Sequence, residues 1–250
     1  MRDYEQELKQ RVAFIQFALR DAHCQGVVFG NSGGKDSALV GVLCKLACPD
    51  TIGVAMPCQS TRNFGEDMED ALALARQFDI ETLTVDLSQV KEALCAQIAP
   101  LQQLTQPALA NVAPRLRMTT LYAVAQSRNA LVAGTGNKCE RYMGYFTKWG
   151  DGACDFNPIA DLTVSEIYEF LAYLKAPENI RKKAPSAGLF EGQTDEAEMG
   201  VTYRDIEMYM AEGSCGGAQD SIIRRAHQIT EHKRRMPLVY TGSDESSRQL

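Results

Sequence analysis

The sequence has 250 residues, 45% of them hydrophobic and 23% charged, which is an ordinary globular composition and long enough for one large α/β domain. A net charge of −6 argues against broad electrostatic attraction to nucleic acid or membranes, and no apolar run is long enough to span a bilayer. The eight cysteines include no pair of CxxC units, so we expect no zinc site and a reducing, cytoplasmic location.

Apolar and amphipathic segments alternate over the first half of the chain. An amphipathic helix over 3–22 precedes a buried strand over 26–30, a glycine-rich turn and a helix that runs to about residue 47. Further strands are predicted at 51–56, 82–85 and 130–134, helices at 64–78, 88–98 and 114–128, and a proline-containing loop at 99–111. This alternation implies a doubly wound, mostly parallel sheet with helices on both faces, whose ligands lie at the carboxyl ends of the strands.

The chain becomes mostly helical after residue 150. The apolar spacing predicts helices at 163–175, 178–182, 203–212 and 216–235. Residues 184–200 are rich in glycine, proline and acidic side chains, which is typical of a mobile lid over a site. No linker or internal repeat divides the sequence.

A strand, a glycine turn and a helix start meet in the stretch Gly30-Asn31-Ser32-Gly33-Gly34-Lys35-Asp36-Ser37. Backbone N–H groups at a helix N-terminus favour an anion, and adjacent glycines let a phosphate approach closely. Asp36 would repel a phosphate unless its carboxylate holds Mg²⁺. The stretch fits neither the Walker nor the Rossmann pattern, and it resembles the SGGxDS loop of ATP pyrophosphatases, which cleave ATP between the α and β phosphates. A glycine turn without a ligand is the alternative.

A second polar loop, Gly134–Glu140, follows the fourth predicted strand. Its glutamate is another carboxylate at the carboxyl edge of the sheet, so Asp36 and Glu140 could share one metal ion. The alternative is that Glu140 is a surface glutamate that opens a helix.

Several later segments match one family in the same order. They are Gly144–Gly152 with Asp155, then Lys182–Leu189, Gly192–Glu196 and His232–Pro237. With these segments the chain resembles the NAD⁺ synthetases over about residues 10–237. The resemblance implies a Rossmann-like ATP pyrophosphatase fold with a helical C-terminal part, in a single domain over 1–250.

The resemblance also implies a two-step ligase reaction with ATP as co-substrate and Mg²⁺ as cofactor. The nicotinate carboxylate of deamido-NAD⁺ attacks the α-phosphate of ATP, pyrophosphate leaves, and an acyl adenylate forms. Ammonia then attacks the acyl carbon and releases NAD⁺ and AMP. ATP is needed because a carboxylate is a poor electrophile until adenylation supplies a leaving group.

Residue roles carry over by position, with Asp36, Glu140 and Lys148 as the predicted catalytic residues. Asp36 and Glu140 would also bind Mg²⁺. The predicted ATP contacts are Gly30, Asn31, Ser32, Gly33, Gly34, Lys35, Asp36, Ser37, Thr135 and Ser186. The predicted contacts to the dinucleotide are Arg115, Lys148, Asp155, His232 and Lys233. Without the family, Arg115 could be a solvated helix residue, Asp155 a turn cap, and His232 a surface residue.

Three positions leave questions open. Many members of the family carry a lysine near Val164 that contacts ATP, so here that contact is lost or supplied elsewhere. Cys139 stands where serine or alanine is common, and a packed cysteine is the simpler interpretation. The sequence does not decide whether Lys35 contacts a phosphate or solvent.

About 25 residues precede the first strand, too few for the amidase domain of glutamine-dependent members. We therefore expect the chain to use free ammonia, or to receive it from a separate amidase partner, and to form a homodimer. One rival is a tRNA-thiolating or GMP-synthetase-like enzyme, which the net charge and the absence of CxxC units disfavour. The other rival is a non-catalytic nucleotide sensor. The presence of Asp36, Glu140 and Lys148 argues against it, and the departure from the family at Val164 is its only support.

Overall fold

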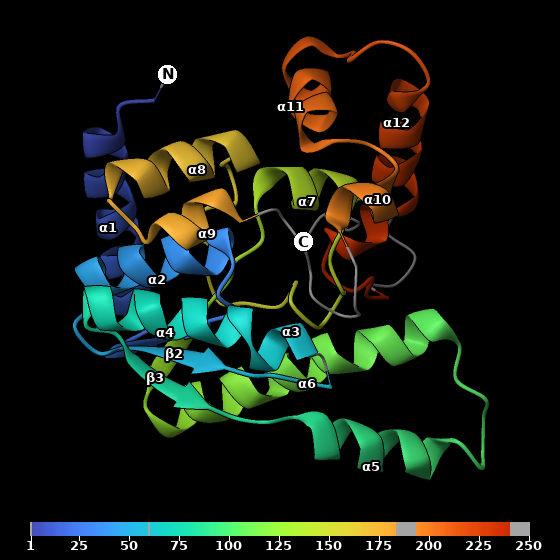
Figure 1. The fold of residues 1–250 in the computed structure, drawn as a ribbon, viewed down its shortest axis with the longest axis horizontal. Coiled ribbons are helices and arrows are strands. Elements are labelled where there is room, and N and C mark those ends of the chain that lie inside the picture. The colour runs from blue at the N-terminus through green and yellow to red at the C-terminus, as the bar shows by residue number, and fades with distance from the viewer. Residues whose placement is uncertain (1, 60, 184–193, 241–250) are drawn as a thin grey trace.

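The described chain forms one sheet of four parallel strands in the order β3-β2-β1-β4, of which β2 and β3 are labelled in Figure 1. They are β1 (Gly26–Gly30), β2 (Thr51–Ala55), β3 (Glu81–Thr84) and β4 (Ala130–Ala133). Val27 of β1 pairs with Thr51 on one side and with Leu131 on the other. The computed structural model describes residues 2–59, 61–183 and 194–240. The predicted parallel sheet is confirmed.

One face of the sheet packs against α2 (Lys35–Ala47) and α4 (Glu66–Phe78), and α2 is covered in turn by α1 (Tyr4–Asp21), α8 (Val164–Tyr173) and α9 (Glu178–Lys182) (Figure 1). Side chains alternate along β1 as a pleated strand requires. Val27 and Phe29 join a core with helix residues such as Leu39 and Phe170, whereas Val28 joins the core of the opposite face. Helices on both faces explain why this strand is apolar throughout.

The opposite face is covered by α6 (Gln106–Ser127), with α5 (Ser88–Ile98) beyond it (Figure 1). The predicted loop over 99–111 is wrong for its second half, because α6 begins at Gln106. Thr105 caps this helix, and Pro107 lies in its first turn, where a missing N–H costs no helical hydrogen bond. Pro114 lies inside the helix without ending it. Proline therefore started this helix rather than breaking it.

The C-terminal part forms a helical unit around its own apolar cluster. Its elements are α7 (Lys138–Met143), α10 (Asp195–Met199), α11 (Tyr203–Glu212), α12 (Gln219–Ile229) and the 3-10 helix η1 (Glu231–Lys233). Cys139, Val164, Tyr203, Ile206 and Ile223 are buried together there. The predicted helix over 216–235 is thus divided into α12 and η1. The predicted helix over 64–78 is likewise preceded by a separate short helix, α3 (Thr61–Phe64).

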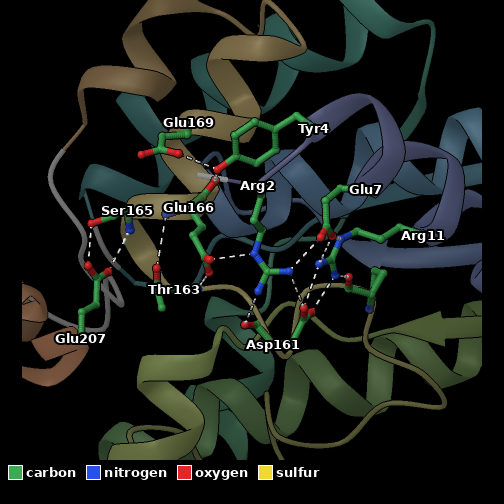
Figure 2. A network of polar contacts seen from close by, with 11 residues as sticks. Arg2, Tyr4, Glu7, Arg11, Asp161, Thr163, Ser165, Glu166, Glu169 and Glu207 are labelled. Carbon is green, nitrogen blue, oxygen red and sulfur yellow. Dashed lines mark hydrogen bonds and ion pairs between the residues drawn. The ribbon is translucent and has the colours of Figure 1, made fainter. Parts of the chain in front are cut away.

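A network of ion pairs joins α1 to the segment 157–166 (Figure 2). Arg11 is 8% exposed, and it donates to the carbonyl of Pro158 and to both Glu7 and Asp161. Arg2 donates to Glu166 at 2.7 Å. The same segment supports the loop after β4, since Asn157 Nδ2 donates to Gly136 O at 2.9 Å and the N–H of Lys138 donates to Leu162 O at 2.8 Å.

No helix within residues 2–59, 61–183 and 194–240 combines the length and apolar character needed to cross a bilayer. Residues 184–193, which include most of the predicted lid and the predicted ATP contact Ser186, lie outside the described residues.

Candidate active site

A cavity of about 610 Å³ opens at the carboxyl ends of the strands, between the two polar loops. This volume lies within the range of small-molecule and cofactor sites. The Gly30–Ser37 loop forms one wall and the Gly134–Glu140 loop forms another. The predicted site residues that line the cavity are Gly30, Asn31, Ser32, Gly34, Lys35, Asp36, Ser37, Thr135, Glu140 and Lys233.

The Gly30–Ser37 loop is held by its backbone shape and by short polar contacts. Gly33 has φ +73°, and a Cβ there would lie 2.1 Å from the carbonyl oxygen of Asp67, so a larger residue cannot fit. Ser32 and Ser37 share a hydrogen bond of 3.0 Å between their hydroxyls. Gly34 is the N-cap of α2 and has no side chain to satisfy the first N–H groups of the helix. Those donors and the helix dipole suit a phosphate at this position.

Asn137 connects the two carboxylates that the sequence singles out. Its side chain is fully buried, and its Nδ2 donates to Asp36 Oδ1 at 3.1 Å. Its backbone N–H donates to Glu140 Oε2 at 3.0 Å, and its Oδ1 accepts from the N–H of Glu140 at 3.0 Å. The last two bonds form a capping box that starts α7. One amide thus fixes Asp36 and Glu140 relative to each other.

Asp36, Glu140 and the buried ammonium of Lys35 influence one another's pKa values. Burial raises the pKa of Glu140 well above its usual value, and the negative charge of Asp36 raises it further. Burial alone would lower the pKa of Lys35, but attraction to Asp36 and Glu140 outweighs it and the pKa is raised. Two neighbouring hard oxygen donors whose charges repel each other fit Mg²⁺, which neutralises both. Asp36 and Glu140 are therefore suitable metal ligands.

The segment 144–152 forms a further wall of the cavity. Lys233 Nζ donates to the carbonyls of Gly144 and Phe146, each at 2.8 Å, so its ammonium fixes this turn. The hydroxyl of Thr147 donates to Asn111 Oδ1 at 2.5 Å, and the N–H of Thr147 donates to Asp151 Oδ1 at 3.0 Å. The predicted substrate contact Lys233 lines the cavity with its ammonium already bound to backbone.

Four predicted substrate contacts, Arg115, Lys148, Asp155 and His232, lie outside the cavity lining in the part of the chain that the structure describes. Lys148 Nζ donates to His232 O at 2.5 Å, and Arg115 Nη2 donates to Lys148 O at 3.4 Å, so three of them form a group beside the cavity. Asp155 accepts from the N–H of Val132 at 2.7 Å and from the Tyr122 hydroxyl at 3.2 Å. This carboxylate therefore links Tyr122 of α6 to β4 in the described structure.

Two cations in the lining were missed by the sequence analysis. Arg117 donates to Met56 O at 3.1 Å and to Asn63 Oδ1 at 3.1 Å, which fixes the end of β2. Lys183 pairs with Asp67 at 2.7 Å and with Asp70 at 2.6 Å. Arg117 lies within the predicted helix over 114–128, but its partners Met56 and Asn63 are distant in sequence and are brought to it only by tertiary packing. Nothing local to Lys183 indicates its partners.

The two departures from the family have structural answers. Val164 is 5% exposed and packs beside Cys139 and Tyr203, so this position contributes an apolar side chain to the core. Burial raises the pKa of the Cys139 thiol to about 12, which makes a thiolate unavailable at neutral pH. The packed-cysteine interpretation therefore agrees with the structure.

A parallel sheet whose first strand leads through a glycine loop into a helix N-terminus, with carboxylates facing that loop, defines an ATP pyrophosphatase fold. The sequence matches the NAD synthase family over residues 7–237, and the chain belongs to that family.

Known proteins resemble the chain over nearly its whole length. An NH₃-dependent NAD⁺ synthetase of Carboxydothermus hydrogenoformans is 44% identical over 95% of this chain and 98% of its own length. The structure of NMN synthetase from Francisella tularensis superposes with a TM-score of 0.90 and 38% identity, covering 97% of this chain and 100% of the other. The NH₃-dependent NAD synthetase of Campylobacter jejuni gives 0.80 and 32%, covering 96% and 100%.

Proposed function

We propose that the chain is a ligase that amidates the nicotinate carboxylate of deamido-NAD⁺ with ammonia, at the expense of ATP. The observation that carries the proposal is the cavity between the Gly30–Ser37 loop, called the phosphate-type loop from here on, and Glu140. The chain that holds this cavity is 44% identical to an NH₃-dependent NAD⁺ synthetase. Neither loop alone would suffice, because an ATP-cleaving site needs both hydrogen-bond donors to the phosphates and groups that offset the phosphate charge.

The first step is adenylation of the substrate. A nicotinate oxygen forms a bond to the α-phosphorus of ATP, and the bond from that phosphorus to the α,β-bridging oxygen breaks, which releases pyrophosphate. The N–H groups at the start of α2 and the hydroxyls of Ser32 and Ser37 would bind the phosphates. Asp36 and Glu140 would hold Mg²⁺, which when bound supplies positive charge against the phosphate oxygens.

The second step is aminolysis. Ammonia attacks the acyl carbon, the bond from that carbon to the AMP oxygen breaks, and a proton leaves the new nitrogen as the amide forms. The site contributes mainly orientation, since the adenylate is already activated. The segment 144–152, held by Lys233, is the wall against which the nicotinate end would be ordered.

The test is a product assay with purified protein, ATP, Mg²⁺ and deamido-NAD⁺, which compares ammonium with glutamine as the nitrogen source. NAD⁺ and AMP formed with ammonium, and little formed with glutamine, is the expected result. AMP and pyrophosphate without NAD⁺ would retain the ATP chemistry and reject the acceptor. Substantial activity with glutamine would reject the ammonia-dependent assignment.

A second candidate acceptor is the mononucleotide, nicotinic acid mononucleotide, with NMN as the product. It is favoured by the TM-score of 0.90 to the structure of NMN synthetase from Francisella tularensis. Arg115, Lys148 and His232, the predicted contacts to the dinucleotide, also lie outside the cavity lining in the described part of the chain. Competition between the two acceptors at equal concentration decides between them, since the product ratio reports the ratio of kcat/KM.

The assembly and location also belong to this proposal. A homodimer is supported by exposed apolar side chains on α5, Val90 and Leu94, which a second copy of the chain would cover. A reducing, cytoplasmic location is supported by eight free cysteines. A separate amidase partner would be revealed by glutamine-dependent activity that appears only in cell extract.

A further inference from the structure

Lys35 takes no part in the chemistry proposed above, although it is the first residue of α2 and belongs to the phosphate-type loop. Its side chain is buried, and its Nζ donates to Asp36 Oδ2 at 2.7 Å. The same ammonium lies 5.5 Å from the centre of the Tyr203 ring of α11. The side chain of Lys35 therefore points toward Asp36 and toward Tyr203 of the C-terminal helices.

Within the described residues, the other hydrogen-bond partner of these carboxylates is the neutral Asn137. Asp36 Oδ1 accepts from the amide of Asn137, and Glu140 Oε2 accepts from the backbone N–H of Asn137. Such bonds orient the carboxylates but leave their charge in place. Lys35 supplies a positive charge to them, and inside a cavity this attraction is several times stronger than in water.

We propose that Lys35 is a tethered counter-ion, which provides the positive charge at Asp36 and Glu140 until a metal–nucleotide complex binds. The inference rests on the proposed role of these two residues as metal ligands. An ammonium bound to one metal ligand repels a free divalent cation and occupies one of the oxygens that the cation would use. When ATP binds, the negative charge of its phosphates offsets the repulsion between the Lys35 ammonium and the metal ion, so both can occupy the cavity together.

The consequence is an order of binding. Free Mg²⁺ would bind weakly to the empty cavity, and the metal would enter with ATP. Lys35 is on this account a positioning residue, because it acts on the metal ligands and contacts no reacting atom.

The experiment measures Mn²⁺ binding by electron paramagnetic resonance with the full chain and no nucleotide. The wild type is expected to show a dissociation constant of at least about 1 mM, since few protein ligands are available to the ion. Lys35→Met keeps an apolar arm over Tyr203 and removes the charge, so Mn²⁺ should bind at least about tenfold more tightly. Lys35→Arg, which keeps the charge, should resemble the wild type.

Lys45→Met is the matched control, because Lys45 lies in the last turn of the same helix and its loss changes the net charge equally. It should leave Mn²⁺ binding unchanged. A second readout is thermal unfolding in a chelator. Lys35→Met should unfold at a lower temperature than the wild type and recover when Mn²⁺ is added, whereas Lys45→Met should show no such recovery.

Tight stoichiometric Mn²⁺ binding by the wild type without nucleotide would overturn the proposal, and this measurement needs no variant to fold. Unchanged affinity in Lys35→Met would overturn it as well. The double variant Lys35→Met/Asp36→Asn should lose the gained affinity.

The reaction itself separates this inference from the metal-site assignment on which it rests. If Asp36→Asn and Glu140→Gln raise the Mg²⁺ requirement of the reaction while Lys35→Met binds Mn²⁺ no better, the Lys35 inference alone fails. If those two variants leave the requirement unchanged, the metal-site assignment fails with it.

Discussion

The network between α1 and the segment 157–166 (Figure 2) and the carboxylates of the cavity use the same residue types in opposite ways. In the network, Arg2 and Arg11 donate to Glu7, Asp161 and Glu166 through several charged hydrogen bonds. In the cavity, the ammonium of Lys35 lies near Asp36 and Glu140, and Asn137 is their other hydrogen-bond partner among the described residues.

The difference is visible in the pKa directions. Burial would raise the pKa of Asp161 and of Glu166, but hydrogen bonds from Arg11 and Arg2 respectively outweigh it, and both pKa values are lowered. Burial and the charge of Asp36 raise the pKa of Glu140. Charges that stabilise the fold are paired within the protein, whereas charges that await a ligand are left partly uncompensated.

The largest expected effect is on Asp36. Asp36→Asn should lower the rate of AMP formation about 1,000-fold, because a charged metal ligand at the phosphates is lost. Asp161→Asn, the same change in the network, should leave that rate within about threefold after correction for folded protein. AMP formation by Asp36→Asn near the wild-type rate at saturating Mg²⁺ would contradict the comparison.

Arg11→Met should give the largest loss of stability. It removes the bonds of Arg11 to Glu7 and Asp161, which then keep only Arg2, and leaves the carbonyl of Pro158 without this donor, so the free energy of unfolding should fall by about 2 kcal/mol. Urea unfolding measures it. Lys9→Met, which breaks an exposed pair with Glu5 on the same helix, should cost less than about 0.5 kcal/mol. Equal losses in the two variants would show that burial of the pair is unimportant.

Glu140 and Glu166 form a matched pair, because both are the third residue of a helix with a capping box. Glutamine can keep the cap in either position. Glu140→Gln should raise the Mg²⁺ concentration for half-maximal activity about tenfold, which corresponds to about 1.4 kcal/mol. Glu166→Gln should leave the Mg²⁺ titration unchanged. An unchanged titration for Glu140→Gln would remove this residue from the metal site.

The smallest expected effect is on how the free energy of unfolding depends on pH in the acid range. Because the pKa of Glu166 is lower in the folded than in the unfolded protein, its contribution is complete above the unfolded pKa and is lost as pH falls through the folded pKa. Glu166→Gln should therefore be less stable than the wild type by about 0.5 kcal/mol at pH 7, and the difference should vanish in strong acid. A difference that is constant with pH would mean that lost packing, and not charge, is responsible.

Local patterns predicted most of the fold. The helices at 88–98, 178–182 and 203–212 agree with α5, α9 and α11 in both boundaries. The error at 99–111 came from treating Pro107 as a breaker, although Thr105 before it is a cap and a first-turn proline fits a helix. The strand order was not predicted, because it depends on pairings between segments far apart in sequence.

Some features of the site follow from local sequence, and others depend on tertiary packing. The strand–turn–helix of the Gly30–Ser37 loop is local, so its place at the sheet edge could be predicted. The spacing of Asn137 and Glu140 is that of a capping box and could have located the start of α7. The direction of the Lys35 side chain could not be predicted, because it depends on Tyr203, which reaches it only through tertiary packing. The same holds for Lys183 and its partners Asp67 and Asp70.

The packing of Tyr203 also has a consequence for synthesis of the protein. This residue of α11 is buried with Cys139 and Val164 and lies against the ammonium of Lys35. On the ribosome, the sheet and the phosphate-type loop emerge long before α11 and α12, and domains fold as their segments become available. The nascent chain can thus form its sheet early, but the cavity is finished only when the last helices have emerged. Catalytic competence is in this sense a late event of translation, and a prematurely terminated chain would carry the loop without an assembled site.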